Sequence, residues 1–466
     1  MYYQYSYEKD YLSEFSDQGE ALDKLETGTD LAVLKTGDES IYRYDQMGTH
    51  SYENSSMQTG TNSTSYYFSV ASGDITNFFN EVDLNTPWDY HYENLDSRTI
   101  LDRLAAVKYF VVKAGEEEYL PYGYDTLAAE AEKKDRLYRA YECKNALPIG
   151  YTYDSYIPEK KYAKMSTVEK QQALLQGVVL ADSAVPETTP EFNDREVSYK
   201  LVTGSGCKEK DGKLIITKEN AQAKLVFDGL DECETYLITE GVDYEALSPR
   251  ELISDKKWNK MTLYEQKKVQ YENSKWRYWK ESQKAYIDVT GQFLDKTISI
   301  FTDKYNAYSG RSDFLCNTGY SEKGKKSITL TFENTGVYSY KDMKVVCQPM
   351  KNIESQTSRL GTESLKDVKI KNHELTGSIS VSKDKVLVIS LPYSKGFQAY
   401  VDGQKTELKQ ANTMYMALEL TKGDHEIRIT YYTPYLKTGL VLTCVGILCY
   451  ICVVLVCKKR RGNKET

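Results

Sequence analysis

The chain has 466 residues, enough for two or three domains, and its 60 Lys and Arg against 68 Asp and Glu give a formal net charge of −8. Its mean hydropathy is −0.58 and 40% of its residues are hydrophobic, values typical of a chain that is mostly in contact with water. This composition excludes a disordered chain, a collagen, a small disulfide-stabilised protein and a protein made mainly of membrane helices. The acidic balance also argues against nucleic-acid binding.

Residues 1–195 are predicted to form a mixed α/β region in which short strands alternate with helices. Residues 41–45, 65–70 and 107–112 are rich in aromatic and β-branched side chains, which favours strands. Residues 184–194 contain two prolines and three acidic residues, so they are expected to form a linker to the next region.

Two helices are expected in this first region because each begins at a capping residue. Ser97 precedes an apolar face that includes Leu101, and is expected to cap that helix. Ser166 and Glu169 have the spacing of a capping box, which predicts a second helix from this point.

Residues 196–434 are predicted to form an antiparallel, jelly-roll-like β-sandwich, so the fold class expected for the whole chain is α+β. Residues 327–333 alternate strictly between polar and apolar side chains. Residues 385–391 are apolar on both faces, as expected for a covered central strand. Tight turns are expected at the Asp-Gly pairs 211–212, 228–229 and 402–403.

A helical hairpin is predicted to interrupt the sandwich at residues 248–285. Ser248 is the expected first helix cap, and Thr262 with Glu265 forms a capping box that opens a helix to about Lys284. Three of the four tryptophans lie in this insertion, and they are the candidate ligand-binding residues: Trp258, Trp276 and Trp279. They form either an exposed platform at a membrane surface or against a sugar, or an aromatic seam that packs the helices on the sandwich.

Residues 436–457 are predicted to form a transmembrane helix, because residues 438–457 contain no charge and form a helix of roughly 30 Å. The basic tail 458–466 follows at once. Residues 436–466 carry a balance of +5, so the other 435 residues carry −13. The positive-inside rule then predicts a cytoplasmic tail and an extracytoplasmic body.

The amino terminus does not fit a stand-alone secreted protein, because it lacks the basic and apolar segments of a signal peptide. The sequence is therefore expected to be the carboxy-terminal part of a larger polytopic protein. A tail-anchored protein is the alternative, but it would carry the basic tail across the membrane, against the charge rule.

No catalytic, metal or cofactor motif is found. Residues 319–325 have the spacing of a phosphate-binding loop, but Lys326 replaces the required Ser or Thr and a strand should follow, so a hairpin loop is expected. The four histidines are far apart, and Cys449 and Cys452 are expected to face lipid. No catalytic residue, metal ligand or cofactor is therefore assigned, and no disulfide framework is predicted.

Several segments resemble the bacterial YfhO-type membrane proteins. Residues 394–403 (SKGFQAYVDG), residues 418–427 (LELTKGDHEI) and the Tyr431-x-x-Pro434 spacing precede an apolar helix and a basic tail, as in that family, although Phe397 stands where the pattern usually has Trp. Further segments are similar to it as well: 41–45 (IYRYD), 104–110 (LAAVKYF) and 147–151 (LPIGY), with Asn145 ahead of the last.

The resemblance implies that the chain is related to multi-pass glycosyltransferases that use polyprenyl-phosphate sugars to decorate envelope polymers such as teichoic acids. The family's catalytic carboxylate would lie in a multi-helix half that this sequence does not contain, so no catalytic role is carried over. The working hypothesis is a membrane-anchored, extracytoplasmic domain that positions the polymer acceptor. The alternative is a non-catalytic, membrane-anchored envelope binding or assembly module. The expected partners are the lipid bilayer, an envelope polysaccharide or teichoic acid, and a separate transferase half.

Overall fold

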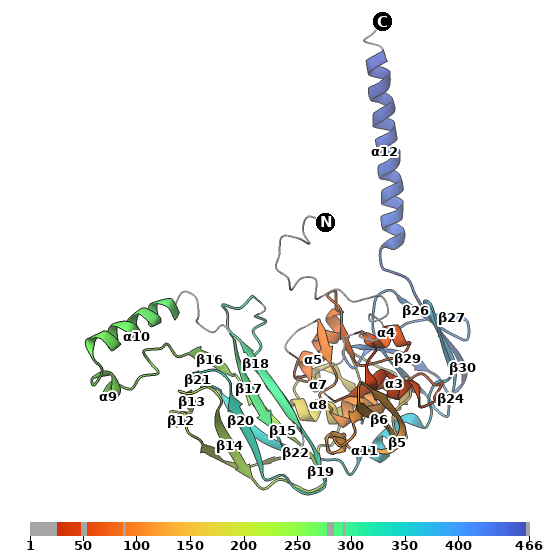
Figure 1. The fold of residues 1–466 in the computed structure, drawn as a ribbon. Coiled ribbons are helices and arrows are strands. Elements are labelled where there is room, and N and C mark those ends of the chain that lie inside the picture. Colours follow the sequence, from red (N-terminus) through yellow and green to blue (C-terminus); the bar gives the residue numbers. More distant parts are fainter. Residues whose placement is uncertain are drawn as a thin grey trace.

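The computed structural model has an α+β architecture with many antiparallel strands, short helices and one long carboxy-terminal helix, which confirms the expected fold class (Figure 1). The structure describes residues 26–47, 54–86, 90–276, 284–291, 294–306 and 308–462. The described strands surround three large hydrophobic cores, one in the amino-terminal part and two among the strands that follow it.

The amino-terminal part is built on a four-stranded sheet with the order β1-β4-β6-β5. Its strands are β1 (Arg43–Gln46), β4 (Val107–Lys113), β5 (Tyr124–Lys133) and β6 (Arg136–Cys143), with β1 parallel to β4. The shorter elements of this part are α3 (Gly28–Leu34), α4 (Ser55–Thr59), β2 (Ser65–Tyr67), α5 (Gly73–Glu81), β3 (His91–Glu93), α6 (Thr99–Leu104), η2 (Glu117–Tyr119), β8 (Tyr156–Pro158), α7 (Glu159–Tyr162), α8 (Thr167–Ala173) and β9 (Val178–Leu180). The strand expected at 107–112 is confirmed, whereas β1 begins later and β2 ends earlier than expected.

The two predicted helix starts of this part differ in outcome. The capping box of α8 is confirmed, because the Ser166 hydroxyl accepts from the Glu169 N–H and the Ser166 N–H donates to the Glu169 carboxylate at 2.7 Å. The prediction for Ser97 is wrong, because Arg98 is the N-cap residue of α6. The N–H of Thr99, which a cap at Ser97 would have received, donates instead to the carboxylate of Glu234 from a distant strand at 3.0 Å.

Residues 195–349 form a β-sandwich whose sheets enclose one core. One sheet has the order β10-β22-β15-β19, and the strands that face it form the sheets β11-β14-β20-β17-β18 and β12-β13-β21-β16. Their bounds are β10 (Arg195–Val197), β11 (Tyr199–Thr203), β12 (Cys207–Lys210), β13 (Lys213–Ile216), β14 (Ala221–Phe227), β15 (Cys233–Glu240), β16 (Asp243–Ala246), β17 (Lys284–Thr290), β18 (Asp295–Phe301), β19 (Phe314–Ser321), β20 (Ser327–Phe332), β21 (Gly336–Ser339) and β22 (Asp342–Pro349). The alternation read in 327–333 is confirmed, because Ile328, Leu330 and Phe332 are all buried in this core.

A second pair of facing sheets follows helix α11 (Ile353–Gly361) and encloses its own core. The sheets have the orders β23-β24-β30-β26-β27 and β28-β29-β25-β7. Their bounds are β7 (Gly150–Tyr153), β23 (Lys366–Lys371), β24 (Glu374–Val381), β25 (Lys385–Pro392), β26 (Phe397–Val401), β27 (Gln404–Thr406), β28 (Lys409–Ala411), β29 (Tyr415–Leu420) and β30 (Gly423–Tyr431). Strand β25 is covered on both faces as predicted: Leu387 packs in this core, and Val386 packs in the amino-terminal core.

The helical insertion consists of α9 (Asp255–Trp258) and α10 (Leu263–Lys275). The capping box at Thr262 is confirmed, but no α-helix begins at Ser248, where only a single turn forms, and Lys284 is the first residue of β17. Neither helix contains a buried residue. The insertion therefore extends away from the sandwich, at the left of Figure 1.

The segment 319–325 connects two different sheets of the sandwich, so the expectation of a hairpin loop is wrong. Lys325, the residue that would bind phosphate in a phosphate-binding loop, is buried. Its ammonium group donates to the carbonyl oxygens of Thr318 and Gly319, the latter at 2.6 Å. These internal hydrogen bonds give Lys325 a structural role in this connection.

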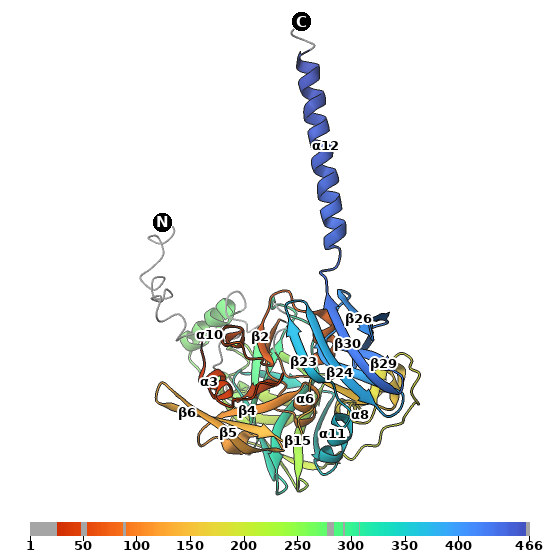
Figure 2. The ribbon, with the colours of Figure 1, turned by 90° about the vertical axis from the view of Figure 1, so that its right-hand side faces the viewer.

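Helix α12 (Leu436–Gly462) leaves the body after β30 and extends away from it (Figures 1 and 2). Among the described residues one helix is long and apolar enough to cross a membrane, and it spans Leu436–Lys458 with none of its apolar window buried. Tyr432 and Tyr435 are exposed at its start, where aromatic side chains suit lipid headgroups. The five cysteines of the body are buried and free, and the four of α12 are exposed.

Candidate functional site

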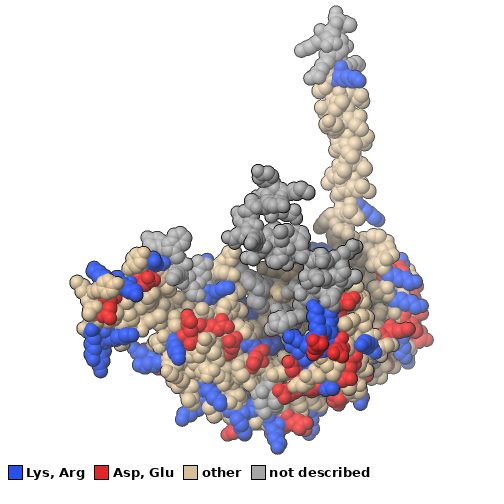
Figure 3. Space-filling model, viewed as in Figure 1, with Lys and Arg blue, Asp and Glu red and all other residues tan. Residues whose placement is uncertain are grey.

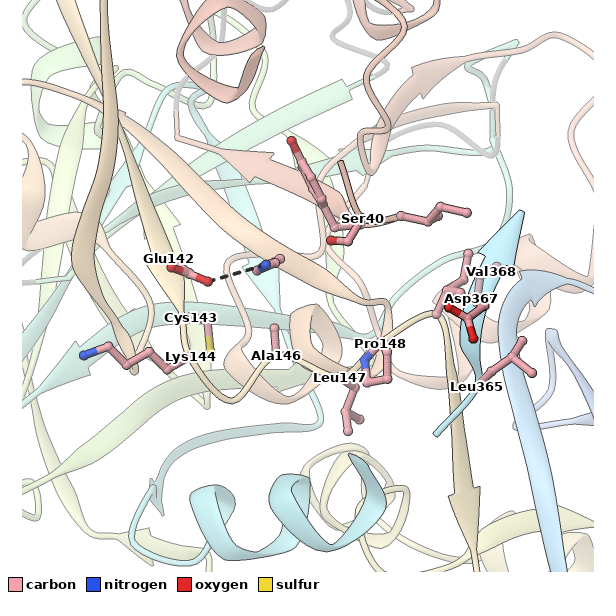
Figure 4. Close-up of a pocket in the computed structure, with 14 residues that line it drawn as sticks. Ser40, Glu142, Cys143, Lys144, Ala146, Leu147, Pro148, Leu365, Asp367 and Val368 are labelled. Atoms are coloured by element: carbon pink, nitrogen blue, oxygen red, sulfur yellow. Dashed lines mark ion pairs between the residues drawn. The ribbon is translucent and has the colours of Figure 1, made fainter. Parts of the chain in front are cut away.

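A groove of about 540 Å³ with a mixed polar and apolar lining lies where the amino-terminal sheet meets strand β23. Residues 40–42 and Lys108 form one side of it, residues 142–144 and 146–149 form its base, and Leu365, Asp367 and Val368 close the other side. Figure 4 shows Ser40 and Glu142 across from Asp367 and Val368, with Pro148 between the two groups.

Lys108 is the central charged residue of the groove, and its side chain is partly buried. Its ammonium nitrogen lies 2.5 Å from an oxygen of Asp38 and 3.5 Å from an oxygen of Glu142 (Figure 4). Tyr109 also donates its hydroxyl to Asp38, at 2.9 Å. Burial alone would raise the pKa of Asp38, but the hydrogen bonds from Lys108, Ser40 and Tyr109 lower it to about 2.

The same contacts keep Lys108 charged. Burial alone would lower its pKa, but the hydrogen bond to Asp38 raises it above its ordinary value. The groove therefore presents a fixed cation between two carboxylates, an arrangement that can hydrogen-bond to sugar hydroxyls and pair with a phosphate.

Tyr42 supplies an aromatic surface beside this cation. Its ring packs edge-on against Tyr109, with ring centroids 4.8 Å apart, and it is only partly buried. Burial raises the pKa of the Tyr42 phenol, so the phenol is neutral at physiological pH. A neutral, partly exposed tyrosine ring is suited to packing against the apolar face of a sugar.

The segments that frame the groove are held together by hydrogen bonds from residues in the motifs quoted for the family resemblance. The guanidinium of Arg43 donates to the carbonyl of Ala105 at 2.6 Å and to the carbonyl of Ser390 at 2.7 Å. Tyr151 donates its hydroxyl to the carbonyl of Leu104 at 3.1 Å. These bonds join β1, the end of α6 and the carboxy-terminal sheet, and so fix the walls on which Tyr42 and Lys108 lie.

Asn145 lies beside the groove and not within it. Its side-chain amide donates to Glu354 of α11, and the same carboxylate forms an ion pair with the buried Arg103 at 2.6 Å. Arg103 also donates to Thr357 at 3.1 Å. The residue ahead of the 147–151 motif therefore fastens the base of the groove to α11.

A buried carboxyl pair consists of one residue of strand β1 and one of helix α6. Asp45 and Asp102 are completely buried. Burial raises the pKa of Asp45 to about 7, and burial together with the charges of Asp45 and Glu234 raises that of Asp102 well above its usual range. The backbone N–H groups of Gln46 and Leu95 donate to Asp45, whereas among the described residues no donor group reaches the Asp102 oxygens. Burial and the neighbouring charges therefore favour the protonated form of Asp102.

Two of the tryptophans predicted from the sequence, Trp258 and Trp276, lie outside this groove, in the hairpin that extends from the sandwich. Trp258 is partly buried and packs beneath the guanidinium of Arg250, whose central carbon lies 4.2 Å from the ring centroid. Trp276 is partly buried at the end of α10, and Trp279 lies outside the described residues. Their role in ligand binding remains a prediction.

Sequence reasoning missed Tyr42, Lys108 and Glu142 as a site. They come from three separate segments, and only the fold brings them together. The available signal was indirect: Tyr42 and Lys108 each lie inside a motif quoted for the family resemblance. Among the described residues, no group of three or more His, Cys, Asp or Glu is arranged to hold a metal ion.

Comparison with known proteins places these features in a family. The model of the family described as "Bacterial membrane protein YfhO" matches residues 2–443. An uncharacterised protein YfhO of Bacillus subtilis (strain 168) is 22% identical over 442 residues, which cover 92% of this chain and 45% of that protein. The chain therefore spans about half the length of this curated relative.

Among solved structures, the arabinofuranosyltransferase AftD from Mycobacteria is similar over 35% of this chain and 13% of its own, with 13% identity and a TM-score of 0.15. A TM-score this low establishes no shared fold. The family match, by contrast, covers nearly the whole sequence and includes the segments that frame the groove. The chain belongs to the YfhO family of bacterial membrane proteins.

Proposed function

We propose that this chain is the membrane-tethered, extracytoplasmic part of a YfhO-family glycosyltransferase, and that its groove holds the acceptor glycopolymer. The observation that carries the proposal is the juxtaposition of the Tyr42 ring with the charged Lys108 at a groove framed by family motifs. The reaction itself is assigned to the multi-helix half of the transferase.

The chemistry of the groove suits an anionic, hydroxyl-rich polymer. The Lys108 ammonium can pair with a phosphate, and Lys144 adds a second, exposed cation at the base. The carboxylate of Glu142 can accept hydrogen bonds from sugar or polyol hydroxyls, and the Tyr42 ring can cover an apolar face. This combination supports a teichoic-acid type of acceptor.

Two further observations support the placement in a larger enzyme. The chain covers 45% of its Bacillus subtilis relative, which leaves room for a second half in that protein. The charge of −13 outside residues 436–466 and of +5 within them supports an extracytoplasmic body and a cytoplasmic tail.

The proposal is tested by measuring the binding of poly(glycerol phosphate) teichoic acid to the full chain in lipid nanodiscs. Replacing Tyr42 with Ala or Lys108 with Gln should weaken binding about tenfold each, because an aromatic contact or a charge-assisted hydrogen bond contributes about 1–2 kcal/mol. Tyr42→Phe and Lys108→Arg keep the ring and the charge, and should retain most of the affinity.

Matched controls use the same substitutions elsewhere. Tyr308→Ala removes an exposed tyrosine and Lys210→Gln removes an exposed lysine, both outside the groove, so neither should change the affinity. Thermal unfolding of each variant verifies that the fold is intact. Equal affinity in the groove variants and these controls would overturn the proposal for the groove.

The non-catalytic binding or assembly module is the second candidate, and the anchored, acidic body favours it equally well. The two are separated by asking whether the chain co-purifies with a multi-helix transferase half from the membranes of its source. Capture of such a half supports the transferase, and polymer binding without one supports the module.

A further inference from the structure

A basic, exposed helical hairpin lies at residues 248–276, away from the groove. Within these bounds seven Lys and Arg oppose four Asp and Glu, although the chain outside residues 436–466 is strongly acidic. Figure 3 shows Lys and Arg gathered on this hairpin, at the left of the molecule.

The lysines of the hairpin are available to a partner. All six are exposed, and none has an acidic side chain within ion-pair distance among the described residues: Lys256, Lys257, Lys260, Lys267, Lys268 and Lys275. On α10 the residues Tyr264, Lys268, Tyr271 and Lys275 follow a spacing that places them on one face of the helix. Tyr264 is 78% exposed and Tyr271 is 59% exposed.

The hairpin is held in shape by its own contacts. Gln266 of α10 donates to the carbonyl of Trp258 at 3.0 Å, and Asn273 accepts from the Arg250 N–H at 3.1 Å. Because no residue of either helix is buried, packing against the sandwich does not explain the exposed tyrosines and lysines. A face that alternates tyrosine and lysine matches the needs of a bilayer interface, where the ring lies among headgroups and the ammonium pairs with phosphate.

The position of the hairpin agrees with such a surface. In both views of the ribbon, α10 lies near the end of the body from which α12 leaves toward the membrane (Figures 1 and 2). We propose that this hairpin is a second membrane contact, which docks the sandwich onto anionic phospholipid headgroups. The hairpin and α12 lie on opposite sides of the body in Figure 1, so two contacts with the same surface hold the body in one orientation over the bilayer.

The test uses the intrinsic fluorescence of the full chain, because three of its four tryptophans lie at residues 258–279. The chain is reconstituted in vesicles of phosphatidylcholine alone or of phosphatidylcholine with phosphatidylglycerol, each with and without brominated acyl chains. Bromine should quench the tryptophans in the anionic vesicles and much less in the neutral ones. High salt should reduce the quenching, because it screens exposed charges.

Two matched variants separate a local contact from a general effect of charge. K256Q/K257Q/K267Q/K268Q should reduce the quenching to at most about half of its native level, because each lysine near an anionic surface strengthens the contact. K208Q/K210Q/K213Q/K224Q removes the same charge from exposed positions of the sandwich and should leave it unchanged.

Three results would overturn the proposal. They are equal quenching in neutral and anionic vesicles, no quenching in either, and unchanged quenching in the hairpin variant. A tryptophan response to soluble teichoic acid in neutral vesicles would assign the hairpin to the polymer in place of the lipid. None of these results depends on the groove, whose test measures polymer affinity.

Discussion

The buried carboxyl pair of Asp45 and Asp102 ties the stability of the fold to pH. Because burial and neighbouring charge raise the pKa of Asp102 above its unfolded value of 3.8, the folded state binds more protons than the unfolded state above about pH 4. The stabilisation supplied by the protonated form is therefore complete below this pH and is lost as the pH rises through the folded pKa. Asp45, with a pKa of about 7, acts in the same direction.

The substitution Asp102→Asn keeps the shape of the side chain but removes the group that ionises. As the pH rises from 5 to 7, the unfolding free energy of this variant minus that of the native chain should increase by about 1 kcal/mol per pH unit. Denaturant unfolding in detergent measures it. The exposed Asp211→Asn is the control. If the difference in unfolding free energy between Asp102→Asn and the native chain stayed constant from pH 5 to pH 7, the raised pKa of Asp102 would be contradicted.

The groove residues show how far single positions can be predicted. Lys108 is one of 60 Lys and Arg, and nothing beside it in the sequence marks it. Its ion pair with Asp38 joins residues 70 positions apart, so the fixed charge arises only in the folded chain. The family-like segments 41–45 and 104–110 supply Ile41, Tyr42 and Lys108 to the groove, but no site was predicted in them.

At the scale of helices and strands, local patterns were predicted well where their partners are near in sequence. The capping boxes at Ser166 and Thr262 are confirmed because each is complete within four residues. The turns at 211–212 and 402–403 are confirmed, since both residues of each pair have positive φ and join paired strands. The tight turn expected at 228–229 is wrong, because this pair has no positive φ and lies between strands of different sheets. The cap predicted at Ser97 is wrong because a distant carboxylate, that of Glu234, takes its hydrogen bond.

The two capping boxes support a matched experiment, because the same motif lies in two different surroundings. Helix α8 contains buried residues, so Ser166→Ala should lower the global unfolding free energy by about 1 kcal/mol. Helix α10 contains none, so Thr262→Ala should fray that helix alone. Hydrogen exchange should then accelerate about fivefold at 263–275, with no change in the unfolding midpoint. An equal loss of global stability in both variants would contradict this distinction.

At the scale of the whole molecule, the orientation of the anchor follows from charge and can be tested directly. The cysteine substitution Ser205→Cys lies at an exposed turn of the body, and Asn463→Cys lies in the basic tail. A membrane-impermeant maleimide applied to intact cells should label the first position, and should reach the second only after permeabilisation. The unsubstituted chain, whose body cysteines are buried, measures the background. The reverse pattern would place the body in the cytoplasm.

The sequence by itself determined the membrane helix, its basic tail, the α+β class, the family, the capping boxes at Ser166 and Thr262 and the alternating strand at 327–333. These depend on composition or on residues a few positions apart, so they need no knowledge of the fold. The tertiary structure alone decided the groove, the Ser97 cap and the role of Lys325, because each depends on partners that the chain brings together. The pairing of β7 with the carboxy-terminal strand β25 also depends on the tertiary structure, because their sheet packs against two hydrophobic cores built from distant parts of the chain.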